Sequence, residues 1–252
     1  MTCQNNYSLK KLIQAILQRL VGFRNYLFVF SLYKSKTITN DKHEGDFSYF
    51  LSLIKATSNV LDIGANIGIM TTNLAAKAYQ GKVFAFEPIP DNIATLKRVI
   101  RFNKLTNVQL FECALGNEAK QTQMVLPVIS AVKMQGLAHI IDKSITEFND
   151  GLTFTVEQYR IDDLPELQQV KIDAIKIDVE NFEYQVFLGA KQLITSNKPV
   201  IYCELWDNEN RKNCFDLMQQ MDYQTYILLN KELVLFDFKK HTTQNFFFLH
   251  KV

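Results

Sequence analysis

The sequence predicts an α/β fold with a mostly parallel sheet and an antiparallel edge. From Phe47 onward, short apolar runs of strand character alternate with segments whose apolar residues recur at helical spacing. Strands that alternate with helices in this way form a parallel sheet covered on both faces. The last part of the chain has strand-like runs with no helix between them, so we expect antiparallel pairing there.

Three strands and three helices are expected in the first half of this pattern. Apolar residues at helical spacing begin at Phe47, and another amphipathic helix starts at Pro90, a residue type favoured in the first helical turn. The expected elements are a helix over 47–54, a strand over 60–63, a helix over 69–79, a strand over 82–86, a helix from 90 and a strand over 108–111.

The segment from about Gln121 to Tyr159 has a weaker period. Its end, LTFTVEQY, alternates like a half-exposed strand and follows the turn-forming residues Asn149, Asp150 and Gly151. We therefore expect an insertion of antiparallel strands, which often shapes a substrate pocket. The regular pattern then returns with a strand over 174–178, a helix over 182–194, a strand from 199 and a helix over 209–221, and the tail holds the strands TYILLN, LVLFDF and NFFFLH.

Length and composition indicate a globular chain. Its 252 residues are 47% hydrophobic and 21% charged, with nine glycines and five prolines, which excludes collagen-like and low-complexity classes. The four cysteines have no close paired spacing of the zinc or redox type. We expect free thiols in a reducing, cytoplasmic compartment.

The charge distribution separates an N-terminal arm, residues 1–45, from a body, residues 46–252. Residues 1–43 hold seven Lys or Arg against Asp41 alone, a net charge of +6, whereas the remainder has 21 basic against 25 acidic residues, or −4. An acidic body without a basic stripe disfavours a nucleic-acid partner. The basic arm suggests contact with something anionic, such as lipid head groups.

Apolar residues in the arm fall at helical spacing from Leu9 to Leu20, which predicts an amphipathic helix. We expect the arm to pack on the body as a lid or brace, and peripheral binding to a membrane surface is the alternative. Arg24 and Asn25 interrupt the next apolar run, so no stretch is long enough to span a membrane. Arg19 and the lack of a cleavage pattern likewise disfavour a signal peptide.

A glycine turn follows the strand that contains Asp62. The turn has the form D-x-G-x-N-x-G, with Gly64, Asn66 and Gly68, and it departs from the G-x-G-x-x-G fingerprint of dinucleotide sites. A carboxylate at such a turn repels pyrophosphate but suits an ammonium or sulfonium centre. Glu87 ends the next strand, 19 residues after Gly68, where an acidic residue binds ribose hydroxyls in such folds. Together these residues indicate a nucleoside with a cationic tail, which describes S-adenosylmethionine.

Four segments in series resemble the FkbM family of S-adenosylmethionine-dependent methyltransferases. They are VLDIGANIGIMTTNLA, GKVFAFEPIPDNIATLKRVIRFN, NVQLFECALGN and IKIDVENFEYQVFLGA, and YRIDDL precedes the last of them as in the family. The resemblance covers residues 58–205. It implies a Rossmann-like class I methyltransferase fold, with a seven-stranded sheet whose seventh strand is antiparallel. It also implies O-methylation of a sugar or another small hydroxylated metabolite.

The resemblance also implies a set of cofactor-binding residues. The glycine turn would surround the methionine part of the cofactor, Glu87 would bind its ribose, and Ala114 and Leu115 would border the adenine. Where the family has glycine after DVE, this chain has Asn181, which tolerates a left-handed backbone, so we expect the turn to persist. The full set is Asp62, Gly64, Asn66, Gly68, Glu87, Pro88, Ala114, Leu115 and Asp178.

Methyl transfer to a hydroxyl requires alignment of donor and acceptor and removal of the hydroxyl proton. Asp178 and Glu180 follow the fourth strand of the sheet and Glu204 ends the fifth, so all three are candidate catalytic residues. For Glu183 we favour a structural role at the start of the next helix. His139 is a weaker candidate for the base, since a lone histidine is more often structural. Whether a divalent cation takes part stays open, because the carboxylates have no metal-specific pattern.

The sequence leaves alternatives for the acceptor and for the activity. The chain lacks the N/D-P-P-Y/F/W segment that amino-group methyltransferases of nucleic-acid bases use, so we expect a small-molecule or glycan acceptor and no nucleic acid. A protein that binds S-adenosylmethionine without transferring its methyl group is one alternative, and N-methylation of a small molecule is another. An NAD-dependent oxidoreductase is disfavoured by the Asp62 turn.

Overall fold

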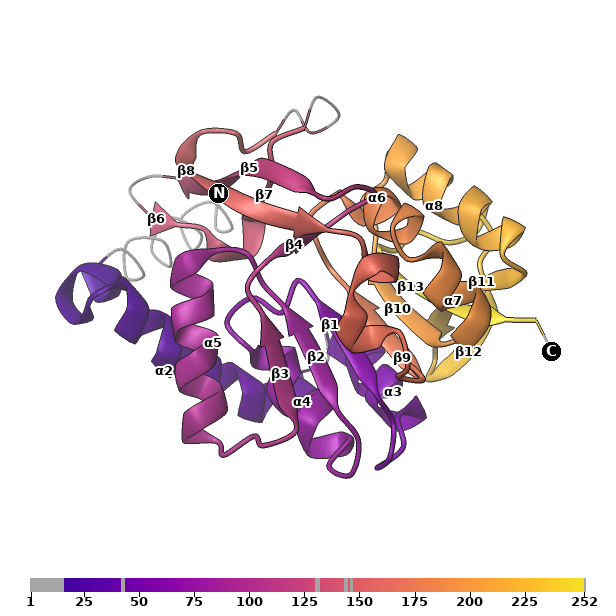
Figure 1. Cartoon of the computed structure of the whole chain (residues 1–252), viewed down its shortest axis with the longest axis horizontal. Helices are drawn as coiled ribbons and strands as arrows, with labels where there is room; N and C mark the ends of the chain where they lie inside the picture. Colours follow the sequence, from indigo (N-terminus) through magenta and orange to yellow (C-terminus); the bar gives the residue numbers. More distant parts are fainter. Residues whose placement is uncertain (1–15, 42–43, 130–131, 143–144, 146, 252) are drawn as a thin grey trace.

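A computed structural model of the chain describes residues 16–41, 44–129, 132–142, 145 and 147–251. In this described part, one sheet of eight strands runs through the molecule in the order β12-β11-β13-β10-β9-β1-β2-β3 (Figure 1). Its strands are β1 (Val60–Ile63), β2 (Val83–Phe86), β3 (Val108–Phe111), β9 (Ala174–Ile177), β10 (Val200–Glu204), β11 (Tyr223–Leu229), β12 (Glu232–Leu235) and β13 (Asn245–His250).

Alternate side chains of the central strands face two different groups of helices. Leu61 and Ile63 belong to a core shared with helices that follow β9 and β10, whereas Val60 belongs to a core shared with helices that precede and follow β1. Both faces are therefore covered, as the buried strand runs predict. The helices are α2 (Phe23–Thr37), α3 (Gly45–Leu53), α4 (Ile69–Lys77), α5 (Pro90–Phe102), α6 (Glu183–Leu188), α7 (Lys191–Asn197) and α8 (Glu209–Gln220).

The predicted fold class is confirmed, and the sheet has the eight strands that the strand-like runs predict, one more than the seven that the resemblance implies. The strands β3, β2, β1, β9 and β10 pair in parallel, and β13 lies antiparallel between β10 and β11. The additional strand is β12, which pairs antiparallel with β11. Asn230 and Lys231 join these two strands with φ angles of 52° and 69°, and positive φ at both central residues is what a tight hairpin turn requires.

The insertion forms a second sheet, as its alternating pattern predicts. The long strands β5 (Lys120–Ile129) and β8 (Gly151–Tyr159) are antiparallel, and β4 (Ala114–Leu115), β6 (Val132–Lys133) and β7 (His139–Ile140) complete the sheet. Met124, Ile140 and Val156 from this sheet pack with Ile89 and Phe182, which follow β2 and β9. The insertion therefore stands over the carboxyl ends of the parallel strands (Figure 1).

The helix expected over 182–194 is two helices, α6 and α7. The break lies at Gly189, where a Cβ would collide with the backbone carbonyl of Gly116. Asp162 then caps the second helix, because its carboxylate accepts hydrogen bonds from the backbone N–H groups of Gln192 (3.0 Å) and Leu193 (2.9 Å). A continuous apolar period hid this break in the sequence.

The described part of the N-terminal arm packs on the body. Helix α2 lies against α4 and α5 (Figure 1). Its Leu27 is fully buried. Arg24 forms an ion pair of 2.7 Å with Asp91 of α5. Gln18 and Lys133 of the insertion exchange two hydrogen bonds between the Gln18 amide and the Lys133 backbone, at 3.3 and 3.4 Å.

Most of the amphipathic helix predicted from Leu9 to Leu20 lies outside the described residues, which are helical from residue 16 to residue 21. In the part of the chain that the structure describes, no helix is both long enough and apolar enough to cross a membrane.

Candidate active site

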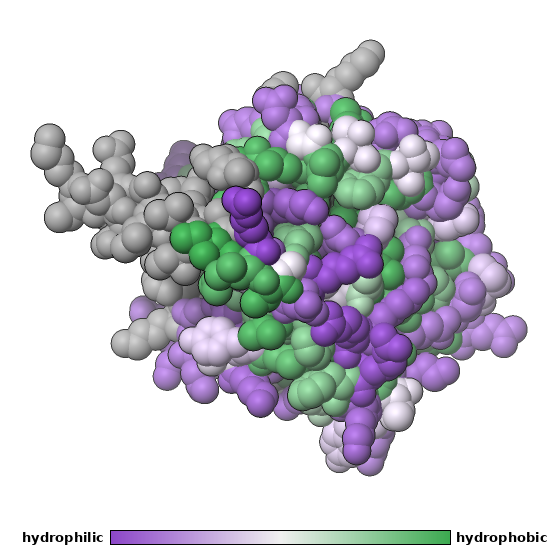
Figure 2. All heavy atoms as spheres, turned by 90° about the vertical axis from the view of Figure 1, so that its left-hand side faces the viewer, coloured by the Kyte–Doolittle hydropathy of each residue, from purple (hydrophilic) through white to green (hydrophobic). Residues whose placement is uncertain are grey.

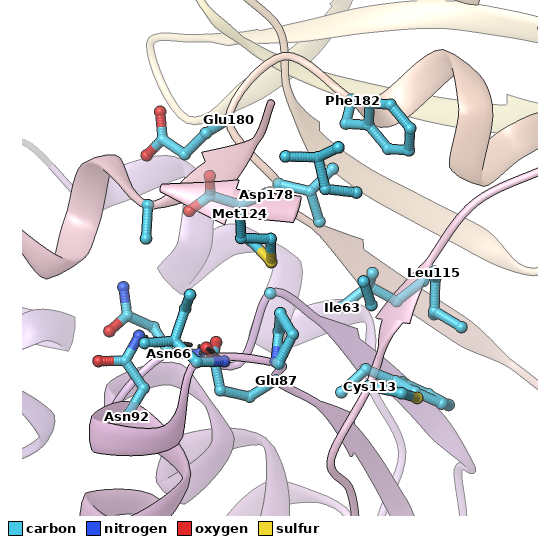
Figure 3. A pocket seen from close by; sticks show the side chains of 18 of the residues that line it. Ile63, Asn66, Glu87, Asn92, Cys113, Leu115, Met124, Asp178, Glu180 and Phe182 are labelled. Carbon is cyan, nitrogen blue, oxygen red and sulfur yellow. Dashed lines mark hydrogen bonds between the residues drawn. The ribbon is translucent and has the colours of Figure 1, made fainter. Parts of the chain in front are cut away.

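A cleft opens between the carboxyl ends of the strands and the insertion (Figure 3). The β1–α4 turn and the end of β2 form one side, the segment after β9 forms another, and the insertion closes the top. Its lining includes Gly64, Asn66, Glu87, Pro88, Asn92, Ala114, Leu115, Gln135, Asp178 and Glu180.

The glycine turn is shaped by a neighbouring strand as well as by the cleft. Gly64 has a φ of +75°, and a Cβ there would collide with the backbone carbonyl of Asp178. Gly68 has a φ of +86° and faces Leu96 where α4 begins. Gly64 and Asn66 line the cleft, whereas Gly68 does not. The turn thus brings its backbone close to Asp178, directly after β9.

Asp62 lies in the core beneath the glycine turn and does not line the cleft. Its side chain is fully buried, accepts a 2.6 Å hydrogen bond from the Thr71 hydroxyl and lies 3.6 Å from Nζ of Lys176. Lys176 in turn donates to the carbonyl of Gly64 at 2.9 Å. Burial opposes the charge on Lys176, but Asp62, Asp178 and Glu204 together raise the pKa of its ammonium group above the usual value. The expectation that Asp62 itself opens toward the ligand does not match this geometry, because the short strand turns its side chain into the core.

Glu87 lies at the centre of one wall of the cleft, beside Asn66 (Figure 3). Its Oε2 accepts a 2.8 Å hydrogen bond from the backbone N–H of Asn66, and its Oε1 accepts from Ile89 N–H (2.8 Å) and from Asn92 Nδ2 (3.2 Å). Burial raises the pKa of the Glu87 carboxyl to about 7 in spite of these donors. Since each carboxylate oxygen can accept two hydrogen bonds, Oε2 retains capacity for a hydroxyl.

Three amide side chains around Glu87 carry buried oxygens without hydrogen-bond partners among the described residues. They are Oδ1 of Asn66, Oδ1 of Asn92 and Oε1 of Gln135, and all three residues line the cleft. Asn92 is only 2% exposed. A buried acceptor without a partner is costly, so this wall fits a ligand that donates several hydrogen bonds. The sequence reasoning missed Asn92 and Gln135, although Asn92 lies on the first turn of the helix that follows Glu87.

The carboxylates after β9 lie on the opposite side of the cleft from Glu87 (Figure 3). Glu180 and Asn181 have φ angles of 53° and 76°, so the predicted left-handed backbone at Asn181 is present and extends to its neighbour. Asp178 and Glu180 line the cleft, whereas Glu204 lies outside it. Burial raises the pKa of Glu180, with further increases from Asp178 and Glu204. Burial and Asp178 likewise raise the pKa of Glu204.

Two other candidates have structural surroundings. Glu183 is 1% exposed and accepts hydrogen bonds from the backbone N–H groups of Val179 (3.2 Å) and Asn181 (3.1 Å) and from Asn210 Nδ2 (2.8 Å). His139 is 3% exposed, and its ring nitrogens contact the Leu137 carbonyl and Asn149 Oδ1. Neither residue lines the cleft. Within the described ranges, no group of three or more His, Cys, Asp or Glu is arranged to hold a metal ion.

Ala114 and Leu115 form the buried apolar end of the cleft, next to Cys113 (Figure 3). They are the residues that the resemblance places beside the adenine, and that role stays a prediction. Pro88 lines the cleft directly after Glu87.

Two curated methyltransferases are similar to this chain in sequence. The chain is 27% identical over 161 residues to Methyltransferase 1 of Beauveria bassiana (strain ARSEF 2860), which covers 57% of this chain and 63% of the relative. It is 25% identical over 170 residues to Methyltransferase sdnD of Sordaria araneosa, covering 58% of this chain and 66% of the relative. The chain therefore spans just under two thirds of the length of these curated relatives.

A solved structure shares the fold. Methyltransferase FkbM from Methylobacillus flagellatus KT superposes with a TM-score of 0.51 at 16% identity, over 78% of this chain and 44% of that one. The family model described as the methyltransferase FkbM domain matches residues 62–228, a range that includes both walls of the cleft. The chain belongs to the FkbM family of S-adenosylmethionine-dependent methyltransferases.

Proposed function

We propose that the protein transfers the methyl group of S-adenosylmethionine to a hydroxyl of a sugar, a glycan or another small metabolite. The observation that carries the proposal is the composition of a single cleft. One wall presents Glu87 with the buried acceptor oxygen of Asn92, and the opposite wall presents Asp178 and Glu180. Methyl transfer requires the nucleoside and the acceptor hydroxyl to be held side by side, so the residues that bind each must face the same cleft.

The residues present fit the cofactor. The ribose hydroxyls would donate to Glu87 and to Oδ1 of Asn92, which has no other partner among the described residues. The ammonium group of the methionine part would lie by the glycine turn at Gly64 and Asn66, and the adenine would lie against Ala114 and Leu115, with Pro88 between the two ends. When bound, S-adenosylmethionine supplies a methyl group on a positively charged sulfur.

Asp178 and Glu180 would position the acceptor and take its hydroxyl proton as the oxygen gains the methyl group. Both belong to a group of carboxylates that share the positive charge of Lys176, and burial raises the pKa of Glu180. A carboxylate with a raised pKa is a stronger base once ionised, which suits removal of a hydroxyl proton. Glu204 would act on this pair through charge, since it lies outside the cleft.

N-methylation of a small molecule is the second candidate. The observation that favours it is the surplus of negative charge near Asp178, since burial and the charge of Asp178 both raise the pKa of Glu44, Glu180 and Glu204. A protonated amine would find electrostatic complementarity there. A protein that binds the cofactor without transfer activity is the third.

Two experiments separate these candidates. Isothermal calorimetry with S-adenosylmethionine tests cofactor binding, and a transfer assay on matched panels of hydroxylated and amino acceptors tests the chemistry. Transfer of labelled methyl groups into an extract of the source cells, followed by identification of the product, identifies the acceptor. Cofactor binding without labelled product in any extract fraction would favour the binding protein.

We further infer a reducing, cytoplasmic site of action and no nucleic-acid partner. In support, the three cysteines of the described part, Cys113, Cys203 and Cys214, are buried free thiols, and burial raises the pKa of each. The acidic charge of the body supports a small acceptor over nucleic acid.

A further inference from the structure

The N-terminal arm has an unusual distribution of polar and apolar side chains. A surface helix of a soluble protein normally turns its apolar stripe inward. The buried stripe of α2 consists of Leu27, Ser31 and Ser35. On its outward side, Val29 is 63% exposed and Tyr33 is 64% exposed. The helix is thus partly inverted, with two serines inside and apolar side chains outside.

The inward serines have specific partners, so the orientation of α2 is fixed. The Ser31 hydroxyl donates a 2.8 Å hydrogen bond to the Ile67 carbonyl, next to the glycine turn. Asn73 of α4 donates a 3.0 Å hydrogen bond to the Ser35 carbonyl. Rotating α2 to bury Val29 and Tyr33 would break both contacts.

The helical turn before α2 continues the apolar surface. Figure 2 looks onto the side of the molecule where α2 begins, and apolar side chains gather at the surface there. Leu17, Val21, Val29 and Tyr33 line an open apolar groove bordered by Arg98. We define the outer arm face as Ile16, Leu17, Leu20, Val21, Val29 and Tyr33, each between 42% and 76% exposed.

Basic residues accompany this face on the arm and at the border of the groove. Residues 1–40 contain six Lys or Arg and no Asp or Glu. Arg19 and Lys36 are exposed on the arm, and Arg24 keeps 62% of its side chain exposed although it pairs with Asp91. Arg98 stacks on the Phe28 ring at 4.2 Å, at the border of the groove. The apolar side chains therefore share the arm with two exposed cations, Arg19 and Lys36, and have Arg98 at the border of their groove.

We propose that the outer arm face docks on an anionic lipid surface. Such a surface buries apolar side chains at the level of the head groups and attracts the surrounding cations at the same time. Two copies of this chain would bring like charges together, which opposes self-association. Nucleic acid would meet the cations but would leave the apolar side chains without partners.

The geometry of the arm requires no refolding for docking. The ion pair of Arg24 with Asp91 and the hydrogen bonds of Gln18 with Lys133 already hold the arm against α5 and the insertion. The docked protein would therefore present the edge of the cleft, to which the insertion belongs, beside the lipid surface. This docking is independent of which acceptor the cleft takes.

The test is co-sedimentation of the full chain with vesicles of phosphatidylcholine that contain about one third phosphatidylglycerol, and with vesicles of phosphatidylcholine alone. We expect binding to the anionic vesicles that weakens as salt is added. Leu20→Ser/Val29→Ser should reduce vesicle affinity about tenfold or more, because two exposed apolar side chains are lost. Arg19→Gln/Lys36→Gln should reduce it by about fivefold per charge at low salt.

A matched control is Leu229→Ser/Leu235→Ser, which changes two exposed leucines. They belong to β11 and β12, which lie at the other end of the molecule from the start of α2 (Figure 1). This variant should bind vesicles like the unaltered chain, and cofactor binding by all variants verifies folding. Equal vesicle binding by the arm variant and the control would overturn the proposal. So would absence of binding by the full chain. Vesicle binding that appears only after removal of residues 1–15 would mean that the chain covers its own groove. A dimer that is lost in Leu20→Ser/Val29→Ser would identify a second copy of the chain as the occupant. Either result would overturn the proposal as well.

Discussion

The backbone N–H of Asn66 donates a 2.8 Å hydrogen bond to Oε2 of Glu87. This bond connects the glycine turn after β1 to the end of β2, so two parts of the expected cofactor site hold each other in place. Glu87 also accepts from Ile89 and Asn92. The carboxylate therefore organises its wall of the cleft before any ligand arrives.

Replacing Glu87 tests the cofactor site. Glu87→Ala should weaken S-adenosylmethionine binding about tenfold to a hundredfold, because a hydrogen bond to a charged group contributes about 1.5 to 3 kcal/mol. Isothermal calorimetry measures the change. Glu118→Ala removes the same charge from an exposed position on the insertion and should bind the cofactor normally. Unchanged affinity in folded Glu87→Ala would remove this residue from the ribose.

The catalytic carboxylates can be tested one at a time. Asp178→Asn or Glu180→Gln should lower turnover by about 10²-fold or more for whichever residue takes the proton, with a smaller effect on cofactor affinity. Glu118→Gln is a control, because Glu118 is an exposed carboxylate outside the cleft. Normal turnover in both test variants would place proton removal elsewhere.

Substituting two glycines with positive φ distinguishes the energetic cost of the backbone conformation from the cost of steric crowding. Gly22 has a φ of +79° with open space where a Cβ would lie, whereas a Cβ on Gly64 would meet the Asp178 carbonyl. Gly22→Ala should lower the free energy of unfolding by about 1 to 3 kcal/mol, the cost of a sparsely populated backbone conformation. Gly64→Ala should lower it by about 1 to 3 kcal/mol beyond that, because crowding is added. Urea denaturation compares the two, and equal losses would contradict the crowding argument.

The buried carboxyl of Glu183 should make stability depend on pH. Burial raises its pKa from 4.5 to about 7 in the folded protein. Between these values the folded state binds more protons than the unfolded state, so stability falls as pH rises through this window. Glu183→Gln should reduce the fall between about pH 5 and about pH 8 by at most on the order of 3 kcal/mol. Urea denaturation at several pH values measures the slope, and identical slopes in both proteins would refute the assignment.

Deleting the arm tests whether it is part of the fold. Removal of residues 1–40 takes away α2, including the fully buried Leu27 and the Ser31 bond to Ile67. We expect the melting temperature to fall by roughly 5 to 10 °C, because several kcal/mol of apolar burial is lost. Removal of residues 1–15 keeps α2 and should have a smaller effect. An unchanged melting temperature in the longer deletion would mean that the arm is an appendage.

The sequence predicted the central strands well, because buried parallel strands are short apolar runs with few alternatives. The strands at Val60 and Val108 have the expected bounds, and the insertion is antiparallel as expected. The break at Gly189 was missed because the apolar period continues across it, although glycine is a common residue at helix ends. The Gly116 carbonyl that excludes a Cβ at this position lies far away in sequence.

The site residues that directly follow a parallel strand were predictable, because their position in the sequence determines where they lie in the fold. Glu87, Asp178 and Glu180 reach the cleft because strand ends meet at one edge of a parallel sheet. Asp62 shares that edge, but whether its side chain points to the cleft or to the core depends on Thr71 and Lys176, which no local pattern reveals.

The pair of hydrogen bonds between Gln18 and Lys133 connects the arm to the insertion that lines the cleft. Lys133 lies two residues before Gln135, whose side-chain oxygen is buried in the wall of the cleft. Coupling between two binding sites is reciprocal. If a partner bound to the arm changes the affinity for the cofactor, bound cofactor changes the affinity for that partner by the same factor. The affinity of the arm for its partner would then differ between the protein with cofactor in the cleft and the protein without it.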